Sequence, residues 1–408
     1  MNKIILYFLC FGFTTFLNAQ NVKSILLRPA NNPKQYNSIV KLGNVLELSF
    51  DDLDADNKDY YYKIEHMTHD WKPSNLTSSQ YIDGFDQNSI IDVTNSFNSL
   101  QAYTHYSVRL PNVNTVITKS GNYLISVLND DYETVFTRRC VFYEDKSIVG
   151  VATLRSRSTN TSQTDQTVQF RVSHPGIILN NPNQEIKAAL IQNNDWNSVI
   201  NDIPPLFIQP NLLVYNHINY TNFPGNNEFY FFDTKYVRNT SLNIANVVRD
   251  NIYHTYLFTD EPKANRSYTF NPDINGQFVI NSLDPNTSDS RTEADYSMIH
   301  FSLKLDTPIK NKEVYVYGAF NDFELSDENK MTYNEEAGAY ETSILLKQGF
   351  YNYTYAVVDN ENNIDLKTIG GSFFETENEY TALIYYRPIG GFYDRVIGVG
   401  YGFFNQNR

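Results

Sequence analysis

The segment VLELSFDDLDADNKDYYYKIEH, residues 45–66, contains two runs with the two-residue alternation of a β-strand, separated by an acidic connection. Each run gathers its large side chains on one face: Leu46, Leu48 and Phe50 in the first run, and Tyr60, Tyr62, Ile64 and His66 in the second. Asn and Asp favour turns because their side chains bond nearby backbone amides. The segment therefore predicts two antiparallel strands joined by a solvated hairpin connection at residues 54–58.

The same alternation recurs along the chain, and no window sustains a helical apolar stripe over three turns. The further runs are bounded by Asn, Asp, Gly or Pro and read GNYLISVLND, TVQFRVS, IKAALIQNN, EVYVYGAF and YNYTYAVVD. Tyr, Phe and Thr favour strands, and aromatic residues make up 15% of the chain. We therefore predict an all-β fold of tandem immunoglobulin-like, early-set β-sandwich domains.

Polar, turn-rich stretches indicate where the domains meet. The Ser/Thr-rich segment 156–166 is typical of a surface loop, and NSLDPNTSDSRTEADY at 281–296 is the strongest linker candidate. The predicted divisions are an N-terminal β-sandwich at 20–145, a central β domain at 146–288, a C-terminal early-set immunoglobulin-like domain at 289–390 and a tail at 391–408.

The N-terminus has the pattern of a secretory signal peptide. Lys3 precedes an apolar run over 4–17, and the small Ala19 marks the predicted cleavage point, so residues 1–19 are assigned to the signal. No later apolar run is long enough to span a bilayer as a helix. Cleavage leaves one cysteine, Cys140, which excludes an intramolecular disulfide and fits a bacterial periplasm. We expect an exported protein that is monomeric on its own.

The chain carries a net charge of −14, and its Lys and Arg residues are dispersed. An electrostatic grip on phosphates needs clustered basic side chains. The composition therefore argues against nucleic acid as a partner and against docking on anionic lipid through a basic patch.

The aspartates of the opening segment resemble part of a calcium loop. Such a loop needs oxygen ligands at positions 1, 3, 5 and 12 and glycine at position 6. Counting from Asp52, the pattern continues with Asp54 and Asp56, but position 6 is Asn57 and position 12 is Lys63. Because a lysine would repel the cation, we predict no metal site.

Catalytic motifs are missing from the sequence. His66 and His69 are three residues apart, so on a strand they point to opposite faces and do not converge. Glu335 and Glu336 are adjacent and diverge in the same way, which argues against a glycosidase pair. No nucleophile elbow, Walker loop or dinucleotide fingerprint occurs. We predict no catalytic residues, no cofactor and no enzyme activity.

The segment NDIPPLFIQPNLLVYNHINYTNFPGNNEFYFF, residues 201–232, combines rigid proline turns with many aromatic and aliphatic side chains. Tyrosine and other aromatic residues are prominent in the hot spots of protein interfaces. We therefore take four of its residues as candidates for a partner interface: Pro205, Phe207, Tyr215 and Phe223. The alternative explanation is two buried strands and a long ordered loop.

An outer-membrane β-barrel is a further alternative, because alternating strands and Tyr-rich faces suit such a barrel. The intervals between turn signals are irregular, and the chain ends FFNQNR rather than on an aromatic residue. Both features favour a soluble protein.

The C-terminal domain carries a local pattern of its own. VYVYGAFNDFEL, followed later by GFYNYTYAVVDN, resembles the early-set domain of glycogen-binding modules. In those modules a strand ending in a Gly-x-Phe-Asn turn lies beside a Gly-Tyr/Phe-x-Tyr strand, and sugar-binding members stack tryptophan on glucose rings. Here Phe323 stands at the position of that tryptophan, and Trp71 and Trp196 lie in other domains. A carbohydrate-binding accessory module is therefore the alternative function.

Longer phrases resemble a single family over nearly the whole mature chain. They are VKSILLRP, LGNVLELSFDDLDADNKDYYYKIEHMTHDWKPSNLTSSQYIDGFDQNSI, NSFNSLQAYTHYSVRLPN, TKSGNYLISVLN, VFTRRCVFYE and NEFYFFDTK. Together they closely resemble the type IX secretion system plug protein family of gliding and secreting Gram-negative bacteria.

That resemblance implies a non-enzymatic subunit of a protein secretion translocon. Such a subunit seals the periplasmic opening of a giant outer-membrane β-barrel when no substrate is in transit, because a wide open channel would leak periplasmic contents. The partner it implies is the barrel protein, contacted from the periplasmic side. The location it implies is the periplasm, at the inner side of the outer membrane.

Overall fold

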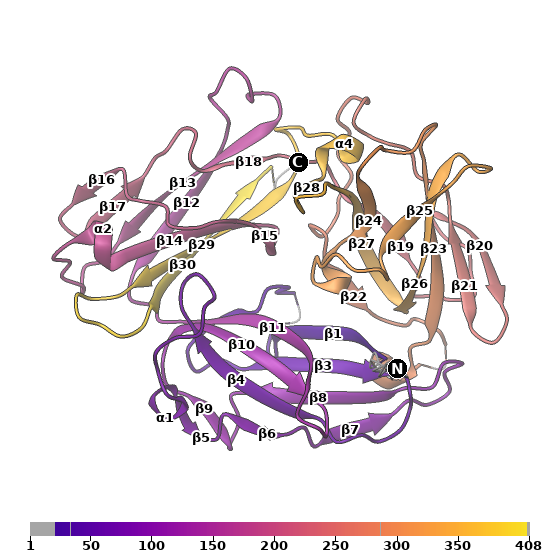
Figure 1. The fold of residues 1–408 in the computed structure, drawn as a ribbon, viewed down its shortest axis with the longest axis horizontal. Helices are drawn as coiled ribbons and strands as arrows, with labels where there is room; N and C mark the ends of the chain where they lie inside the picture. Colours follow the sequence, from indigo (N-terminus) through magenta and orange to yellow (C-terminus); the bar gives the residue numbers. More distant parts are fainter. Residues whose placement is uncertain (1–20, 33, 286, 406–408) are drawn as a thin grey trace, which may run out of the picture.

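The structure, a computed structural model, describes residues 21–32, 34–285 and 287–405. The chain forms three two-layered β units that surround a shared junction (Figure 1). In the described ranges, helical structure is confined to four-residue α-helices and one three-residue 3-10 helix. The all-β prediction is therefore confirmed. The predicted signal peptide at 1–19 lies outside the described residues.

The first sandwich contains the N-terminal strands β1 (Val22–Pro29), β2 (Ile39–Lys41), β3 (Leu46–Asp52), β4 (Tyr61–Met67), β5 (Ile82–Gly84), β6 (Gln87–Ser89), β7 (Asp92–Asn95), β8 (Thr104–Leu110), β9 (Thr115–Ile117), β10 (Gly121–Leu128) and β11 (Thr134–Tyr143). One sheet has the order β1-β3-β8-β7, and the facing sheet has the order β2-β11-β10-β4-β6. The short pair β5–β9 and helix α1 (Ser78–Tyr81) complete the unit.

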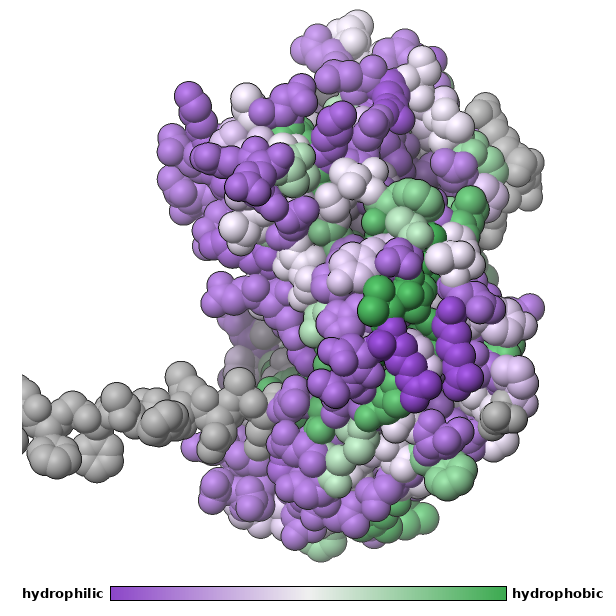
Figure 2. Space-filling view, turned by 90° about the vertical axis from the view of Figure 1, so that its right-hand side faces the viewer, coloured by the Kyte–Doolittle hydropathy of each residue, from purple (hydrophilic) through white to green (hydrophobic). Residues whose placement is uncertain are grey.

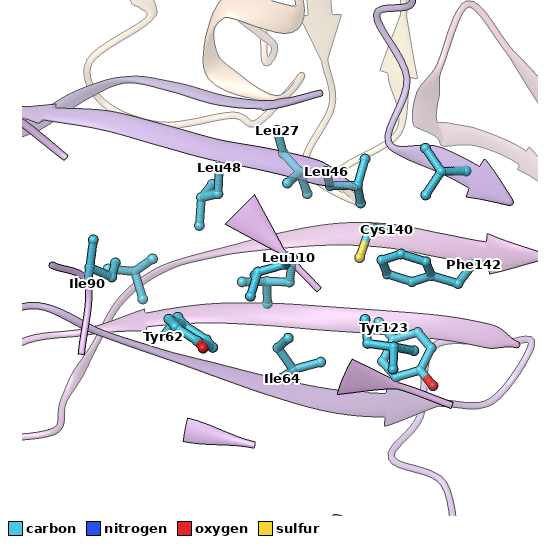
Figure 3. Close-up of a cluster of buried hydrophobic side chains, with 14 of the residues drawn as sticks. Leu27, Leu46, Leu48, Tyr62, Ile64, Ile90, Leu110, Tyr123, Cys140 and Phe142 are labelled. Atoms are coloured by element: carbon cyan, nitrogen blue, oxygen red, sulfur yellow. The ribbon is translucent and has the colours of Figure 1, made fainter. Parts of the chain in front are cut away.

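Both faces predicted for the opening segment point into the core of this sandwich. Figure 3 shows Leu46 and Leu48 on one side of the core and Tyr62 and Ile64 on the other. These side chains are at most 1% exposed. Cys140 lies in the same core, and burial raises the pKa of its thiol. This cysteine is therefore a packing residue.

The pairing predicted for the opening segment is wrong. Strand β3 pairs with β1 and β8, whereas β4 lies in the facing sheet and pairs with β10 and β6. The acidic connection thus crosses from one sheet to the other. Alternation of side chains reports which face of a strand is buried, but it does not report which strand lies beside it.

The second sandwich contains strands β12 (Ile148–Arg155), β13 (Asp165–Ser173), β14 (Ile186–Gln192), β15 (Asp195–Ile200), β16 (Phe207–Gln209), β17 (Leu212–Tyr215), β18 (Asn222–Pro224), β29 (Asn378–Tyr386) and β30 (Arg395–Phe404), with helix α2 (Pro182–Glu185). One sheet has the order β12-β13-β17-β16, with β18 also paired to β13, and the other has the order β15-β14-β29-β30.

The third sandwich is one continuous ten-stranded sheet that folds around its own core. Its strands are β19 (Tyr230–Asp233), β20 (Ile244–Arg249), β21 (Tyr253–Leu257), β22 (Phe278–Ile280), β23 (Tyr296–Lys304), β24 (Glu313–Tyr317), β25 (Lys330–Asn334), β26 (Ala339–Lys347), β27 (Gly349–Val358) and β28 (Ile364–Asp365); its helices are α3 (Ser290–Glu293), the 3-10 helix η1 (Ala319–Asn321) and α4 (Lys367–Gly370). The order is β19-β27-β24-β25-β26-β23-β21-β20, with β22 and β28 paired to β27.

The side of the molecule formed by the third and first sandwiches is mostly hydrophilic, with apolar side chains gathered near its middle (Figure 2). No helix in the described part of the chain combines the length and the apolar character needed to cross a membrane.

The sheets divide the chain differently from the predicted boundaries at 288 and 390. Strands β29 and β30 return to the second sandwich, where β29 pairs with β14 across nearly two hundred residues of sequence. The segment 391–408, predicted as a tail, contains β30, and the strands from β19 to β22 belong to the third sandwich. Alternation and turn residues are local patterns, and they do not show which distant strand will pair with β29. The sequence therefore could not locate this domain boundary.

Close packing between two strands explains why glycines recur near the end of the chain. Gly398, Gly400 and Gly402 alternate along β30 and face β12. A Cβ on Gly400 would lie 2.6 Å from Val149 Cγ1 and 2.7 Å from the Val149 carbonyl oxygen. Only glycine permits such a close approach of two strands, and here it brings the last strand against the first strand of this sandwich.

We expect Gly400→Ala to lower the free energy of unfolding by about 1–3 kcal/mol, because the new methyl group overlaps backbone that cannot easily move. Chemical denaturation of the purified protein measures this loss. Gly150→Ala, on the adjacent β12, is the matched control, since a Cβ there meets no atom within 4 Å. Equal stability of the two variants would contradict the packing role of Gly400.

Candidate functional site

The first and third sandwiches meet at a buried ion pair. Lys347 Nζ, at the end of β26, donates to Asp51 Oδ2 on β3 at 2.6 Å, and both side chains are 1% exposed. The Tyr296 hydroxyl donates to the same oxygen at 2.7 Å, and His105 Nδ1 lies 2.6 Å from the other oxygen. Lys347 also lies 4.0 Å from the ring centre of Tyr103. We call these five residues the Asp51 junction.

The Asp51 junction keeps its carboxylate ionised. Burial by itself raises the pKa of Asp51, but Lys347 and His105 more than offset it, so the pKa lies below its ordinary value. Burial lowers the pKa of Lys347, although Asp51 opposes this shift. A buried charge that loses its partner is strongly destabilising. Separating the two sandwiches would leave Asp51 and Lys347 each as a buried charge without its partner, so this ion pair holds the sandwiches together.

The first and second sandwiches meet through His69. Its backbone NH donates to Asp394 Oδ2 at 2.9 Å, its Nδ1 lies 3.3 Å from the same oxygen, and its Nε2 lies 3.1 Å from Asp202 Oδ1. The hydrogen bond to Asp394 raises the pKa of His69 above its ordinary value of 6.5, despite partial burial. Burial raises the pKa of Asp394, but His69 and Arg387 reverse this and bring it to about 2.

Aromatic packing completes this second interface. The rings of Trp71 and Trp196 meet edge to face at 4.8 Å, and the Arg139 guanidinium lies 5.1 Å from the Trp71 ring. These residues border an apolar cluster that takes side chains from both sandwiches, including Val141 and Leu383. The two tryptophans of the chain therefore serve the contact between sandwiches.

The second and third sandwiches enclose a cavity of about 260 Å³ that contains Asp195. Burial raises the pKa of Asp195 to about 6, although the Tyr317 hydroxyl donates to it at 2.7 Å. The neighbouring Asn197 amide donates to the Tyr317 hydroxyl and to the Phe323 carbonyl. The lining residues include Gln192, Ser198 and Thr354 beside Asp195.

The acidic connection holds a cation of its own. Asp52, Asp54 and Asp56 place carboxylate oxygens within 4.8 Å of one another. Lys58 Nζ pairs with all three, at 3.0 Å from Asp52 and 3.4 Å from Asp56, and in closer contact with Asp54. Burial lowers the pKa of Lys58, but Asp54 and Asp52 raise it overall. An ammonium group thus occupies the position that a metal ion would need.

The structure places the predicted partner residues in two environments. Phe207, on β16, is 57% exposed, and Pro205 is half-buried. Tyr215 is fully buried and stacks on Phe170, and Phe223 is 2% exposed beside Tyr380. Tyr215 and Phe223 are therefore core residues and do not face a partner, because alternation along β17 and β18 turns them inward.

Strand β16 is an edge strand: one side pairs with β17, the other side has no partner strand, and its surface is apolar. It ends its sheet beside β17, at the outer end of the second sandwich and away from both interfaces (Figure 1). Leu206, Phe207 and Ile208 are 46%, 57% and 48% exposed. The described residues hold no other run of three consecutive exposed large apolar side chains. Proteins normally protect such an edge, so an exposed one is suited to binding another strand.

The predicted sugar-binding position has no exposed platform. The expected pairing is present, since β24 lies antiparallel to β27 and ends at the turn that begins with Gly318. Phe323, however, is 4% exposed and packs against Tyr317 at 5.2 Å. A ring buried in this way cannot stack on a saccharide.

The comparisons with known proteins agree with this architecture. The model of the family described as "Type 9 secretion system plug protein 1st domain" matches residues 22–144, the span of the first sandwich. A crystal structure of a hypothetical protein from Parabacteroides merdae has a TM-score of 0.89 and 30% identity, covering 94% of this chain and 97% of that chain. The C-terminal domain of a Streptococcus agalactiae AgI/II polypeptide, BspA, covers 93% of this chain and 98% of that one at 6% identity and a TM-score of 0.14, too low to relate the folds. No curated protein matches the chain.

The fold defines a three-part β protein whose sandwiches meet through buried polar and aromatic contacts. The chain belongs to the type 9 secretion system plug protein family. That membership suggests a non-catalytic component of the secretion system.

We expect Lys347→Met to lower the free energy of unfolding by about 3–5 kcal/mol, because it leaves the Asp51 carboxylate buried without its cation. Denaturation monitored by intrinsic fluorescence measures the change, and adding Asp51→Asn to the same chain should recover part of it. Lys330→Met is the control, since its partner Glu313 is about half exposed and surface pairs of this kind contribute little to stability. If Lys347→Met lowers the free energy of unfolding no more than Lys330→Met does, the Asp51–Lys347 pair does not hold the two sandwiches together.

The His69 contact predicts a pH dependence. Because Asp394 raises the folded-state pKa of His69 above its unfolded value, the contact stabilises fully below 6.5 and loses this stabilisation as pH rises through the folded-state pKa. The charged groups facing it are Asp70, Asp202 and Asp394, with Lys187 and Arg387 beyond them.

We therefore expect His69→Gln to cost more stability at about pH 5.5 than at about pH 9. Melting temperatures of both proteins across this range test the expectation. A difference between the two proteins that does not vary with pH would show that His69 contributes by packing alone.

Proposed function

We propose that this protein is the plug subunit that seals the periplasmic opening of the giant outer-membrane β-barrel translocon when no substrate is in transit. The observation that carries the proposal is the match of the first sandwich to the plug family, together with the full-length similarity to a solved structure. On this proposal the chain works in the periplasm, at the inner side of the outer membrane, without catalysis.

The mechanics of a seal support the proposal. A plug must keep its shape against a wide opening, and separate domains on flexible linkers would leave gaps between them. Here each sandwich contacts the other two through buried polar or aromatic contacts, such as Asp51–Lys347 and Trp71–Trp196. A space of about 70 Å³, lined by Arg28, Ile191 and Phe323 among others, lies where residues of all three sandwiches meet.

The edge strand β16 is the surface we propose for the partner. Phe207 and Ile208 of this strand, with Leu206 just before it, offer exposed apolar contact, and the unpaired edge of the strand offers backbone groups to a strand of the barrel protein. Aromatic anchors contribute most to such contacts. Phe207 is therefore the residue whose loss should weaken the complex most.

The complex itself can be tested by purification. The protein, tagged at its C-terminus, is isolated from detergent-solubilised outer membranes of cells whose secreted cargo has been depleted. We expect a very large β-barrel protein to co-purify. The absence of such a protein, with and without cargo, would overturn the proposed function.

The surface is tested with Phe207→Asp in the same purification. A buried charge at the contact should reduce recovery of the barrel at least about tenfold. Phe85→Asp is the matched control, because Phe85 is 69% exposed on the first sandwich and should leave recovery unchanged. If Phe207→Asp retains the barrel as well as the control does, β16 is not the contact surface.

A further inference from the structure

The cavity that contains Asp195 lies between the second and third sandwiches. Residues of strands β15 and β18 line it from the second sandwich, and residues of strands β24, β27 and β28 and of helix α4 line it from the third. Figure 1 shows β15 and β28 close to each other at this interface. The volume of about 260 Å³ is far more than one water molecule needs, so the cavity can hold an organic group of several heavy atoms.

Asp195 brings a carboxylate without a counter-ion into this cavity. Its Oδ2 accepts a hydrogen bond from the Tyr317 hydroxyl at 2.7 Å, and its Oδ1 accepts one from the Asn197 backbone NH at 2.8 Å. A carboxylate has about four lone-pair sites, so each oxygen can accept from a further donor. In the described part of the chain, no lysine, arginine or histidine nitrogen lies within 4.0 Å of this carboxylate.

The surroundings of Asp195 favour a cation from outside the chain. Burial is the largest cause that raises the pKa of Asp195 to about 6, and the nearby Asp322 carboxylate raises it further, although Tyr317 and Asn197 oppose both effects. Asp195 is therefore mostly ionised at neutral pH. Lys367 is the basic residue among the described lining residues, and its side chain is exposed. A charge withdrawn from water is costly unless it is paired, so binding a cation here would relieve that cost.

The rest of the lining indicates which kind of cation fits. Much of it is an apolar wall, formed by Ile200, Phe223, Phe229, Ile364 and Leu366. Such a wall offers nothing to a hydrated metal ion, whereas it packs well against methylene groups. Aromatic rings also attract organic cations, and Tyr317 and Phe323 both line the cavity. The lining therefore suits a cation that carries a short hydrocarbon chain.

We propose that this cavity binds a primary ammonium group on a short alkyl chain, with Asp195 as its counter-ion. The ammonium donates to the open lone pairs of the carboxylate, which makes the hydrogen bonds charge-assisted, and the alkyl chain packs against the apolar wall. Asp195 lies on β15 and its partner Tyr317 on β24, so a bound amine contacts the second and third sandwiches together. A free alkylamine and the lysine side chain of a polypeptide share this chemistry.

Binding of n-butylammonium to the full chain, measured by ligand-observed NMR at about pH 7.5, tests the proposal. n-Butanol has the same shape without the charge and should bind at least about tenfold more weakly. Asp195→Asn keeps an oxygen for the Tyr317 hydroxyl but removes the charge, and should weaken butylammonium binding by a similar factor. Asp327→Asn, at an exposed position of the third sandwich, is the matched control and should bind as the unaltered protein does.

Three results would overturn the site: no binding of butylammonium, equal binding of the amine and the alcohol, or unchanged affinity in Asp195→Asn. Nα-acetyl-lysine methylamide, which carries the same ammonium on a peptide unit, distinguishes the two sources. Tighter binding of this compound than of butylammonium assigns the site to a lysine of a polypeptide, and weaker binding assigns it to a free amine. Either order supports the site, provided that Asp195→Asn weakens binding of both.

The unaltered protein provides a second test that does not depend on the folding of a variant. Since the pKa of Asp195 is about 6, this carboxylate loses its charge at lower pH, whereas the alkylammonium keeps its own. Butylammonium should therefore bind about tenfold more weakly at about pH 5 than at about pH 7.5. The other groups facing Asp195 do not reverse this trend, because burial raises the pKa values of Tyr317 and Asp322 as well. Equal affinity at both pH values would contradict the site.

Discussion

The buried ion pair between Asp51 and Lys347 is the constraint on which the arrangement of the molecule depends. Each group comes from a different sandwich, and each would be left as an isolated charge in an apolar setting if the two sandwiches separated. Such a pair adds little net stability over a well-packed apolar contact, but it penalises every other docking geometry. Tyr296 and His105 satisfy the remaining lone pairs of the carboxylate and so restrict its position further.

The other two interfaces use different chemistry for the same purpose. His69 joins two carboxylates of the second sandwich, and Trp71 packs against Trp196 beside it. Asp195 and Asn197 bind Tyr317 across the third interface. With three sandwiches closed into a ring of pairwise contacts, loosening one interface requires strain at the other two. Rigidity of this kind suits a component that closes an opening.

Chain topology adds to the same rigidity. The chain leaves the second sandwich after β18, builds the whole third sandwich and then returns as β29 and β30. The third sandwich is therefore tethered to the second at both ends. The final strand is held by close backbone approach, since Gly398 and Gly400 lie directly against Ser147 and Val149. Separation of the second and third sandwiches would have to stretch both connections at once.

Local sequence determined the strands and their buried faces, because side-chain alternation and turn residues act over a few positions. The two-residue alternation alone predicted that Leu48 and Tyr62 face the core. The family resemblance followed from long matching segments of sequence. Tertiary structure alone decided that β3 and β4 lie in opposite sheets, that β30 completes the second sandwich, and that Tyr215 and Phe223 are buried. It also made Asp51 an interface charge and brought Asp195 to Tyr317. These outcomes depend on pairings between residues far apart in the chain, and no local pattern of residues encodes which distant partner a strand or a charge will meet.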